Sequence, residues 1–572
     1  MTHPRQSMTM NRTKGVALLL LALLIGLAGC SKERPAADTI ISNARVYTVD
    51  ARQSWAEAVA IRGERILTVG SATEAMRYRA SGTKVIDAGG RLLLPGIEDS
   101  HVHFVSGSGN LAKVDLAGTR TVEEVQARIQ KFALEHPQAA WIQGRGWMYA
   151  AFPGNMPHKK FLDEVVPDRP AIMTCADGHT SWVNSRALAL AGIDRRTPDP
   201  ENGTIVREAN GEPTGALLEA ADFLVEKIVP KPTPDETLAA LREGLREAAR
   251  FGVVRVHGLG GEFEALDLLD RLRREGALTV RFSTAMWVAS PGPSAEEWKA
   301  YEEAGLKYDD EWISLGGIKL MLDGVIDSMT GAMLEPYAGQ RESKGKLFWE
   351  PEAFKRAVTE INAKGIQVST HSIGDAAIRL TLDAYEQGAR ESGNPDLRNK
   401  IEHAEDIAAQ DISRFGKLGV IGSFQPLHAN PDPAWIGAWI KNVGAEREQR
   451  AWAWKTVLDG GGHLAFGSDW PVVTINPWLG LQVAVTRQDS EGRPAGGWLP
   501  EQRLSVAAAV HAYTMGGAFA MRREKDEGSI EAGKLADLIL VSPNIFEVEP
   551  RRIAETKVIL TMVGGKVVFE AR

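Results

Sequence analysis

Two hydrophobic patterns alternate along the chain, and the changes between them mark its organisation. Residues 38–90 and 528–569 contain short runs of alternating apolar and polar residues, separated by Asn, Gly and Asp. This pattern is typical of short β-strands joined by turns. Neither terminal segment is long enough to enclose a core alone. We therefore expect residues 38–93 and 528–572 to pair in one small β-sandwich, with the rest of the chain inserted between them.

The intervening residues 94–527 alternate helical periodicity with short apolar runs, which predicts a parallel α/β arrangement. Eight such units would form a (β/α)₈ TIM barrel, whose active site lies at the C-terminal ends of its strands. Helices are expected at 121–135, 233–250, 352–364, 376–391 and 505–520. Strands are expected at 253–256, 313–322, 366–370, 420–424 and 464–467. Residues from about 106 to 230 are rich in Gly, Pro and Trp and fit no simple βα unit, so we expect an insertion over the barrel mouth.

The first 29 residues have the features of an export signal: basic residues, a short apolar run and small residues before a cysteine. Leu27–Cys30 resembles the bacterial lipoprotein box, which predicts a lipidated Cys30 followed by a tether over residues 30–37. Ser31 favours sorting to the outer membrane, so we expect a lipid anchor on the periplasmic side of the cell envelope. A plain cleaved signal peptide and an uncleaved anchor are the alternatives. With Cys30 lipidated, Cys175 is left without a disulfide partner.

Composition narrows the possible partners. The chain has 572 residues, 44% of them hydrophobic and 24% charged, with a formal net charge of −8. These proportions are ordinary for a globular protein. Removal of the export signal takes away three basic residues and no acid, so the mature chain is more acidic still. This charge gives no support to nucleic-acid binding.

Candidate metal ligands follow several of the expected strands. His101 and His103 stand two residues apart, a spacing that turns both side chains of an extended segment to one side. His371, His403 and Asp469 each end another apolar run. A single H-x-H pair could be two unrelated loop histidines. Strand ends converge in a barrel, however, so together these residues predict one shared site for a divalent metal.

Long segments of the sequence are similar to those of the amidohydrolase superfamily, in the branch of large enzymes that includes N-substituted formamide deformylases. The matching segments are PGIEDSHVHF, IKLMLDGVIDSMTGAMLEPY, VSTHSIGDAAI, KIEHAEDI, LAFGSDWPV, GSIEAGKLADLILV and VGGKVVFE. The resemblance implies a (β/α)₈ barrel in which His101, His103, His371 and His403 hold the metal and Asp469 lies beside it. One or two Zn²⁺ ions are expected, and another divalent metal remains an alternative.

The chemistry of these residue types agrees with that resemblance. A divalent metal held by neutral imidazoles lowers the pKa of bound water and polarises a carbonyl oxygen. Asp469 could accept a proton from this water and return it to the leaving nitrogen. We therefore expect a metal-dependent hydrolase of a C–N bond other than a peptide bond, in an N-substituted amide, a formamide or a cyclic amide. An ester, lactone or phosphoester substrate, and a non-catalytic ligand-binding envelope lipoprotein, are the alternatives.

Lys319 lies in an apolar strand, where an unpaired ammonium group is unfavourable. The resemblance suggests that Lys319 is carboxylated and bridges two metals, and burial would favour that reaction by lowering the pKa of the lysine. The alternative is an ion pair with Asp323 or Asp327.

Further residues are candidate contacts for a small-molecule substrate, although each has a structural alternative as a packing or hydrogen-bonding residue. They are His179, Asp323, His428 and Trp147. We expect His257 to be a structural histidine and His463 to lie at the opposite end of the barrel. Whether the chain forms a homodimer is left open.

Overall fold

The computed structural model describes residues 1–2, 35–340 and 342–571. Most of the expected export signal, Cys30 and residues 31–34 of the tether lie outside these residues. Among the described helices, none combines the length and the apolarity needed to cross a bilayer.

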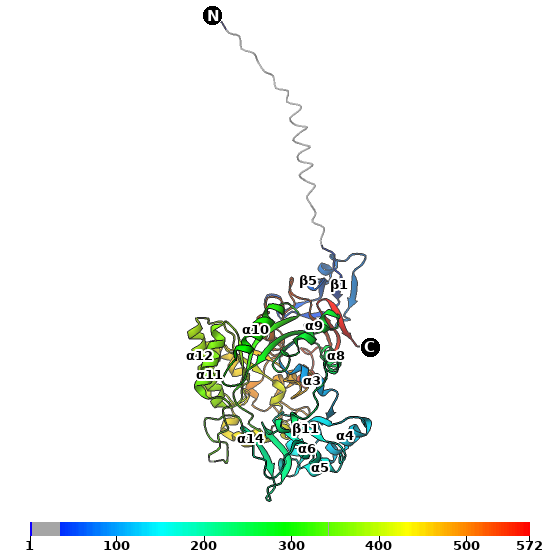
Figure 1. Cartoon of the computed structure of the whole chain (residues 1–572). Helices are drawn as coiled ribbons and strands as arrows, with labels where there is room; N and C mark the ends of the chain where they lie inside the picture. The colour runs from blue at the N-terminus through cyan, green and yellow to red at the C-terminus, as the bar shows by residue number, and fades with distance from the viewer. Residues whose placement is uncertain (3–34, 341, 572) are drawn as a thin grey trace.

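A parallel eight-stranded barrel forms the centre of the molecule (Figure 1). Its strands, in their order around the barrel, are β8 (Ile97–Val102), β15 (Val253–Gly258), β16 (Arg281–Trp287), β17 (Ile313–Met321), β18 (Val368–Ser372), β19 (Lys400–His403), β20 (Ile421–Phe424) and β21 (His463–Phe466). The ring is completed where the strand-end segments of β8 and β21 meet, because the N–H of Asp469 donates to the carbonyl of His101 at 2.8 Å. The predicted (β/α)₈ barrel is confirmed.

Helices follow the strands and cover the outside of the barrel. They include α8 (Pro234–Phe251), α9 (Leu266–Arg274), α10 (Ala295–Lys307), α11 (Pro351–Ala363), α12 (Asp375–Ser392), α13 (Ala409–Leu418), α14 (Pro433–Val443), α16 (Trp454–Asp459) and α17 (Pro477–Thr486). Local sequence explains their limits. In α8, Thr233 and Glu236 form a reciprocal capping box, Pro234 occupies the first turn, and Gly252 ends the helix in the left-handed region at φ 83°.

The prediction of one continuous helix over residues 505–520 is wrong. The structure has two helices, α18 (Val506–Ala512) and α19 (Met515–Ala520), separated by a break at Thr514 (φ −131°, ψ −88°). Gly516 and Gly517 let α19 approach the barrel closely. A Cβ atom on Gly516 would lie 2.3 Å from the carbonyl oxygen of Leu464, and one on Gly517 would lie 2.7 Å from Glu98 Cβ. The direction change therefore seats α19 against the ends of β8 and β21.

Strands from both ends of the chain pack around a second core. A four-stranded sheet contains β1 (Thr39–Ser42), β4 (Ala58–Arg62), β5 (Arg65–Gly70) and β6 (Lys84–Asp87). A six-stranded sheet contains β2 (Arg45–Tyr47), β3 (Trp55–Ala56), β7 (Leu92–Pro95), β22 (Leu538–Ser542), β23 (Lys557–Val563) and β24 (Lys566–Glu570). The antiparallel pairing of β7 with β22 joins the two chain ends, and Val59, Leu93 and Leu538 share one buried cluster.

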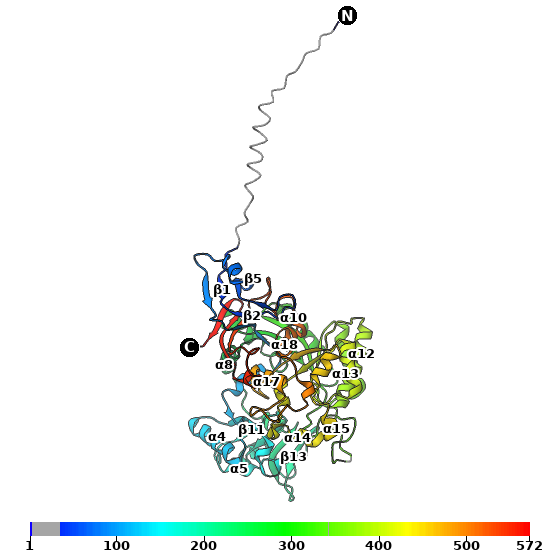
Figure 2. The ribbon, with the colours of Figure 1, turned by 180° about the vertical axis from the view of Figure 1, so that it is seen from behind.

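The insertion has a sheet of its own and lies at the opposite end of the barrel from the β1–β7 and β22–β24 strands (Figures 1 and 2). Its strands are β9 (Val114–Asp115), β10 (Ile142–Trp147), β11 (Ala171–Cys175), β12 (Thr180–Val183), β13 (Gly203–Arg207) and β14 (Pro213–Glu219). Its helices include α4 (Val122–Glu135), α5 (Lys159–Asp163), α6 (Ser185–Ala191) and α7 (Phe223–Glu226).

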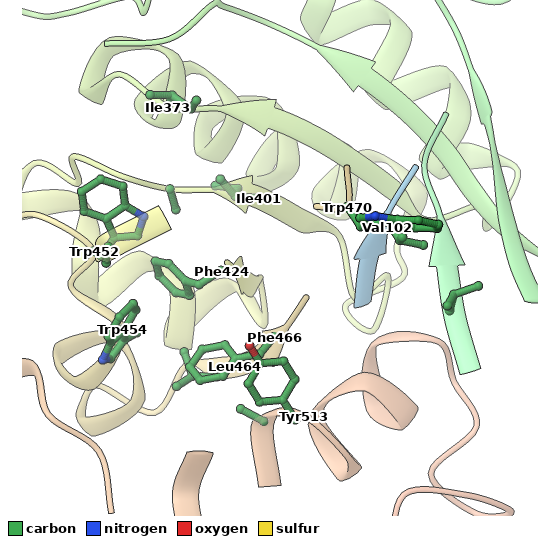
Figure 3. Packing of buried hydrophobic residues seen from close by; sticks show 14 of the residues in the cluster. Val102, Ile373, Ile401, Phe424, Trp452, Trp454, Leu464, Phe466, Trp470 and Tyr513 are labelled. Atoms are coloured by element: carbon green, nitrogen blue, oxygen red, sulfur yellow. The ribbon is translucent and has the colours of Figure 1, made fainter. Parts of the chain in front are cut away.

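Large apolar side chains pack behind the strand ends (Figure 3). Trp454 packs against Phe424 and Phe466 with ring centroids 6.1 and 5.9 Å away, and Phe466 packs against Tyr513 at 5.3 Å. All four rings are buried. Because close-packed interiors deform little, this cluster gives the strand ends a rigid support.

Candidate metal centre

His101, His103 and Asp469 meet at the rim of the barrel. His101 lies in β8, His103 follows it at the start of α3 (Phe104–Asn110), and Asp469 follows β21. Asp469 Oδ1 lies 3.2 Å from His101 Nε2 and 3.1 Å from His103 Nε2. The i, i+2 spacing of the two histidines therefore brings both imidazoles to one carboxylate oxygen.

His371, His403 and His428 continue this group around the rim. His371 lies in β18, His403 ends β19, and His428 lies in the 3₁₀ turn η3 (Pro426–Ala429) after β20. The ring of His403 is 4.5 Å from that of His371, 4.8 Å from that of His101 and 6.1 Å from that of His428, between centroids. Residues more than 300 positions apart thus share one centre, as the sequence predicts.

The donor atoms of this group suit a divalent metal. Nitrogen and carboxylate oxygen atoms from His101, His103 and Asp469 lie within 4.8 Å of one another, and so do those from His403, His428 and Asp469. Buried polar atoms normally have hydrogen-bond partners, yet four here have none among the described residues: His101 Nε2, His403 Nδ1, His428 Nε2 and Asp469 Oδ1. A cation between them would satisfy these atoms, and histidine with carboxylate is a donor set that zinc prefers.

Burial keeps several of these imidazoles in the neutral form that binds metals. Burial lowers the pKa of His103, and it lowers the pKa of His371 and His403 well below the usual value. It lowers the pKa of His428 to about 4. For Asp469, burial raises the pKa, but the neighbouring His101 and His103 outweigh it and hold the pKa well below its ordinary value. The carboxylate is therefore ionised at neutral pH.

Two backbone segments at the centre adopt the left-handed region that non-glycine residues rarely enter. His403 has φ 73°, Ala404 has φ 48° and Asp469 has φ 60°. Such conformations persist where the surrounding structure fixes them, and they gather at functional sites.

A row of buried charges lies behind His101. Glu402 Oε2 is 2.7 Å from His101 Nδ1, and Glu402 Oε1 is 3.0 Å from Lys400 Nζ. Lys400 Nζ also lies 3.0 Å from His257 Nδ1 and donates to the carbonyl of Ser100 at 2.8 Å. His257 is thus a structural residue, as predicted. A hydrogen bond from His101 Nδ1–H to Glu402 would leave Nε2 free for a metal.

Lys319 projects into the same region without an ion pair. It is 2% exposed, and no carboxylate oxygen of the described residues lies within 4.0 Å of its Nζ. Burial lowers its pKa to about 8, assisted by the nearby charge of Lys400, although Glu402 and Asp469 raise it. The alternative considered for Lys319, an ion pair with Asp323 or Asp327, is therefore not formed.

Asp323 has a different role from the expected substrate contact. Its carboxylate accepts hydrogen bonds from the backbone N–H groups of Ala332, Ile373 and Gly374 at 2.8, 3.0 and 2.9 Å. It is fully buried and does not line the cavity. Asp323 therefore fixes the loops that follow β17 and β18.

A cavity of about 840 Å³ opens onto the centre from the side of the insertion. His103, Lys319, His371, His403, His428 and Asp469 line its floor. Several aromatic side chains line its walls, among them Tyr149, Phe223, Trp287, Phe348, Trp435 and Trp452. Trp147 does not line it, because this ring is buried in the core of the insertion and donates its N–H to the carbonyl of Met173 at 2.7 Å. The expectation of a substrate contact at Trp147 is not met.

The insertion contributes His179 to the cavity wall. His179 Nδ1 lies 2.8 Å from Glu219 Oε2, and the backbone N–H of His179 donates to Asp177 Oδ1 at 2.9 Å. The centroid of the His179 ring is 6.4 Å from that of His371. His179 and His428 therefore both line the cavity, and their roles as substrate contacts stay predictions.

Sequence reasoning does not identify Glu219, Glu402 or Lys400 as residues of the site. Glu402 is adjacent to His403 and Lys400 begins the same strand, so the KIEH segment held a signal in its two charges within an apolar run. Glu219 is 40 residues from His179, and only the pairing of β12 with β14 brings them together.

Comparisons with known proteins agree with this architecture. Residues 84–569 match the amidohydrolase family. The chain is 32% identical over 545 residues to the protein LONG AFTER FAR-RED 3 of Arabidopsis thaliana, covering 93% of this chain and 92% of the relative. It is 28% identical over 554 residues to N-substituted formamide deformylase of Arthrobacter pascens, covering 93% and 98%. An uncharacterized metal-dependent hydrolase from Pyrococcus furiosus, solved by crystallography, is 25% identical, with a TM-score of 0.68 over 89% of this chain and all of the other.

Proposed function

The chain belongs to the amidohydrolase family, and we propose on that basis that it is a zinc-dependent hydrolase of an N-substituted amide, a formamide or a cyclic amide. One observation carries the proposal: the donor atoms of four histidines at the ends of three barrel strands and of one aspartate converge, and four of these buried atoms have no hydrogen-bond partner among the described residues. The similarity to an N-substituted formamide deformylase supports a C–N bond as the target.

We propose His101, His103, His371, His403 and Asp469 as the metal ligands, with His428 as a further donor beside Asp469. Lys319, buried and without an ion pair to any described residue, is suited to carboxylation, which would supply a further oxygen ligand if a second ion is bound. When bound, the metal lowers the pKa of a coordinated water molecule and polarises the substrate carbonyl.

We assign the proton transfers of the reaction to Asp469. Its pKa lies well below the ordinary value, so it is a carboxylate at neutral pH. It would accept a proton from the attacking water and later return it to the nitrogen that leaves. Because an amine is a poor leaving group until it is protonated, this return is the step on which cleavage of the C–N bond depends.

The aromatic walls of the cavity suit a bulky apolar substituent on the substrate nitrogen. Closure of the cavity by the insertion would exclude bulk water from the reacting carbonyl. We therefore place the acyl carbon over the floor of the cavity and the N-substituent among the tryptophans and phenylalanines.

A substrate panel with a metal test decides between the candidate reactions. The enzyme should be stripped with a chelator, reloaded with Zn²⁺, and assayed on matched N-aryl and N-benzyl formamides, acetamides, cyclic amides, esters, lactones and phosphoesters. We expect amide turnover that disappears on chelation and returns with zinc. Turnover of esters, lactones or phosphoesters alone would assign the centre to those substrates, and ligand binding without any product would indicate a non-catalytic protein.

Replacement of Asp469 by Asn tests its role within that reaction. Loss of general acid–base catalysis is expected to lower kcat by about 10²–10⁴-fold, while metal analysis finds the histidine ligands still loaded. Retention of kcat near the wild-type value would remove Asp469 as the proton carrier.

A further inference from the structure

The insertion carries a histidine–carboxylate pair that faces the floor of the cavity. His179 lies in the loop between β11 and β12 and Glu219 ends β14, so both residues belong to the insertion and neither belongs to the barrel. Their side chains are 12% and 15% exposed, and both line the cavity. The backbone N–H of Glu219 donates to the carbonyl of His179 at 2.9 Å, which joins the two residues a second time.

This arrangement leaves one ring nitrogen of His179 available to a ligand. Nδ1 is engaged by Glu219 Oε2 at 2.8 Å. Within the described part of the chain, Nε2 makes no hydrogen bond, and the ring lies opposite His371 at 6.4 Å between centroids. Asp177 holds the backbone of His179 through its N–H group at 2.9 Å. The ring is therefore fixed on the roof of the cavity with a free nitrogen.

We propose that His179, oriented by Glu219, donates a hydrogen bond from Nε2 to the carbonyl oxygen of the bound substrate and stabilises the charge that develops there during attack. The inference rests on the proposed function. It adds one catalytic group from the insertion, which forms the roof of the cavity, to the groups of the barrel rim, which form its floor. Asp469 at the floor serves the water and the leaving nitrogen, and a hydrogen bond from His179 would act on the carbonyl oxygen together with the polarisation that a bound metal supplies there. A fixed donor aimed at that oxygen acts without reorganisation during the reaction.

Protonation of His179 agrees with this role. Burial lowers its pKa, but the hydrogen bond and charge of Glu219, with a contribution from Asp177, outweigh burial and the charge of Arg145 and raise the pKa to about 9. Both ring nitrogens then carry protons at neutral pH, so Nε2 is a donor while Nδ1 stays bonded to Glu219.

A second histidine–glutamate pair in the insertion provides a matched control. His158 Nε2 lies 2.8 Å from Glu208 Oε1, with the side chains 27% and 45% exposed. Neither residue lines the cavity. His158→Gln therefore makes the same chemical change in the same part of the molecule without touching the proposed donor.

The test compares zinc-loaded wild type with His179→Gln, Glu219→Gln and His158→Gln. Turnover is measured on N-phenylformamide, and binding is measured by calorimetry with benzylphosphonate, whose tetrahedral oxyanion resembles the charged intermediate. Loss of one oxyanion donor is expected to lower kcat by about 100-fold for His179→Gln with little change in KM, and to weaken phosphonate binding about tenfold or more. Glu219→Gln, which keeps the ring, should fall between wild type and His179→Gln, and His158→Gln should match wild type.

The inference is overturned if His179→Gln retains wild-type kcat and phosphonate affinity, or if His158→Gln loses as much as His179→Gln. It is also overturned if the loss lies entirely in KM, because a donor to the developing oxyanion acts on kcat. If the wild-type enzyme does not turn over any amide, the proposed function fails, and the phosphonate affinities still decide whether His179 is an oxyanion donor.

Discussion

Glu402 determines which nitrogen of His101 faces the metal centre. Its two oxygens are shared between His101 Nδ1 at 2.7 Å and Lys400 Nζ at 3.0 Å, and all three side chains are fully buried. Lys400 holds the pKa of Glu402 well below the ordinary value against the effect of burial, with help from His101. An ionised carboxylate at Nδ1 fixes the tautomer in which Nε2 offers its lone pair.

Glu402→Gln should therefore weaken both the metal centre and the fold. The substitution leaves Lys400 buried without its counter-charge, which is expected to lower the free energy of unfolding by about 3–5 kcal/mol. Loss of the carboxylate behind a histidine ligand is expected to lower zinc affinity by about 10–100-fold. Urea unfolding measures the first effect, and competition with a chromogenic chelator measures the second.

The double variant Glu402→Gln with Lys400→Met separates these two effects. It removes both buried charges, so much of the lost stability should return while zinc affinity remains low. Wild-type zinc affinity in the single variant would contradict the orienting role of Glu402.

The His179–Glu219 pair makes the stability of the insertion depend on pH. The pKa of His179 is raised from 6.5 to about 9, so the folded protein holds this proton more tightly than the unfolded chain. The resulting stabilisation is fully present below about pH 6.5 and is lost as the pH rises through about 9. Wild type should exceed Glu219→Gln in unfolding free energy by on the order of 2–3 kcal/mol near pH 6, and this difference should shrink steadily up to pH 9. Denaturant unfolding across that range is the measurement, and a difference independent of pH would contradict the assignment.

Among the secondary-structure elements, the ends of the barrel strands can be predicted from the sequence more readily than the point at which a helix breaks. The runs before His371, His403 and Asp469 are apolar because barrel strands are buried, and a parallel barrel brings their C-terminal ends to one rim. The break between α18 and α19 could not be inferred in this way, because the helical pattern of the sequence continues through Thr514. Contacts of Gly516 and Gly517 with barrel residues distant in sequence determine where α19 lies.

Gly516→Ala tests whether close approach determines the position of α19. A Cβ atom there would lie 2.3 Å from a backbone oxygen that cannot move aside, so we expect a loss of about 1–3 kcal/mol in unfolding free energy. Gly305→Ala in α10 is the control, because its Cβ would meet only Leu315 Cδ1 at 3.5 Å. A helix-interior Gly→Ala change in open space is expected to stabilise by about 0.4–1 kcal/mol. Urea midpoints compare the variants, and equal stabilisation by both would show that α19 has room to move.

At the scale of the whole molecule, the general architecture could be predicted from sequence and the roof of the cavity could not. Short alternating strands at both ends and βα units between them indicate a barrel joined to a smaller sheet structure, which the shared sheet of β7 and β22 provides. The floor residues follow from the strand ends. The pairing of His179 with Glu219 depends on the register between β12 and β14, and the turning of Trp147 into the insertion core depends on packing. Neither the strand register nor this packing produces a periodic pattern that can be recognised in a single sequence.

The position of residues 37 and 38 relative to the cavity bears on the predicted lipid anchor. Residues 37 and 38 join the β1 end of the molecule through the bond from Ala37 N to the carbonyl of Tyr78 at 2.8 Å, and the insertion lies at the other end (Figure 1). An anchor at Cys30 would therefore hold the protein by the end remote from the cavity mouth and leave the mouth open to solutes.

Cys30→Ser should abolish incorporation of radiolabelled palmitate and move the protein from the membrane to the soluble fraction, because one thiol carries the whole attachment. Cys175→Ser is the matched control, since Cys175 is the other cysteine of the chain and is buried beside the cavity. That variant should keep both the label and the membrane location.

The turnover number of the Cys30→Ser protein should equal that of wild type, because the anchor end and the cavity lie apart. Palmitate label retained in Cys30→Ser would contradict lipidation at this cysteine, and a large fall in turnover would show that attachment and catalysis are coupled.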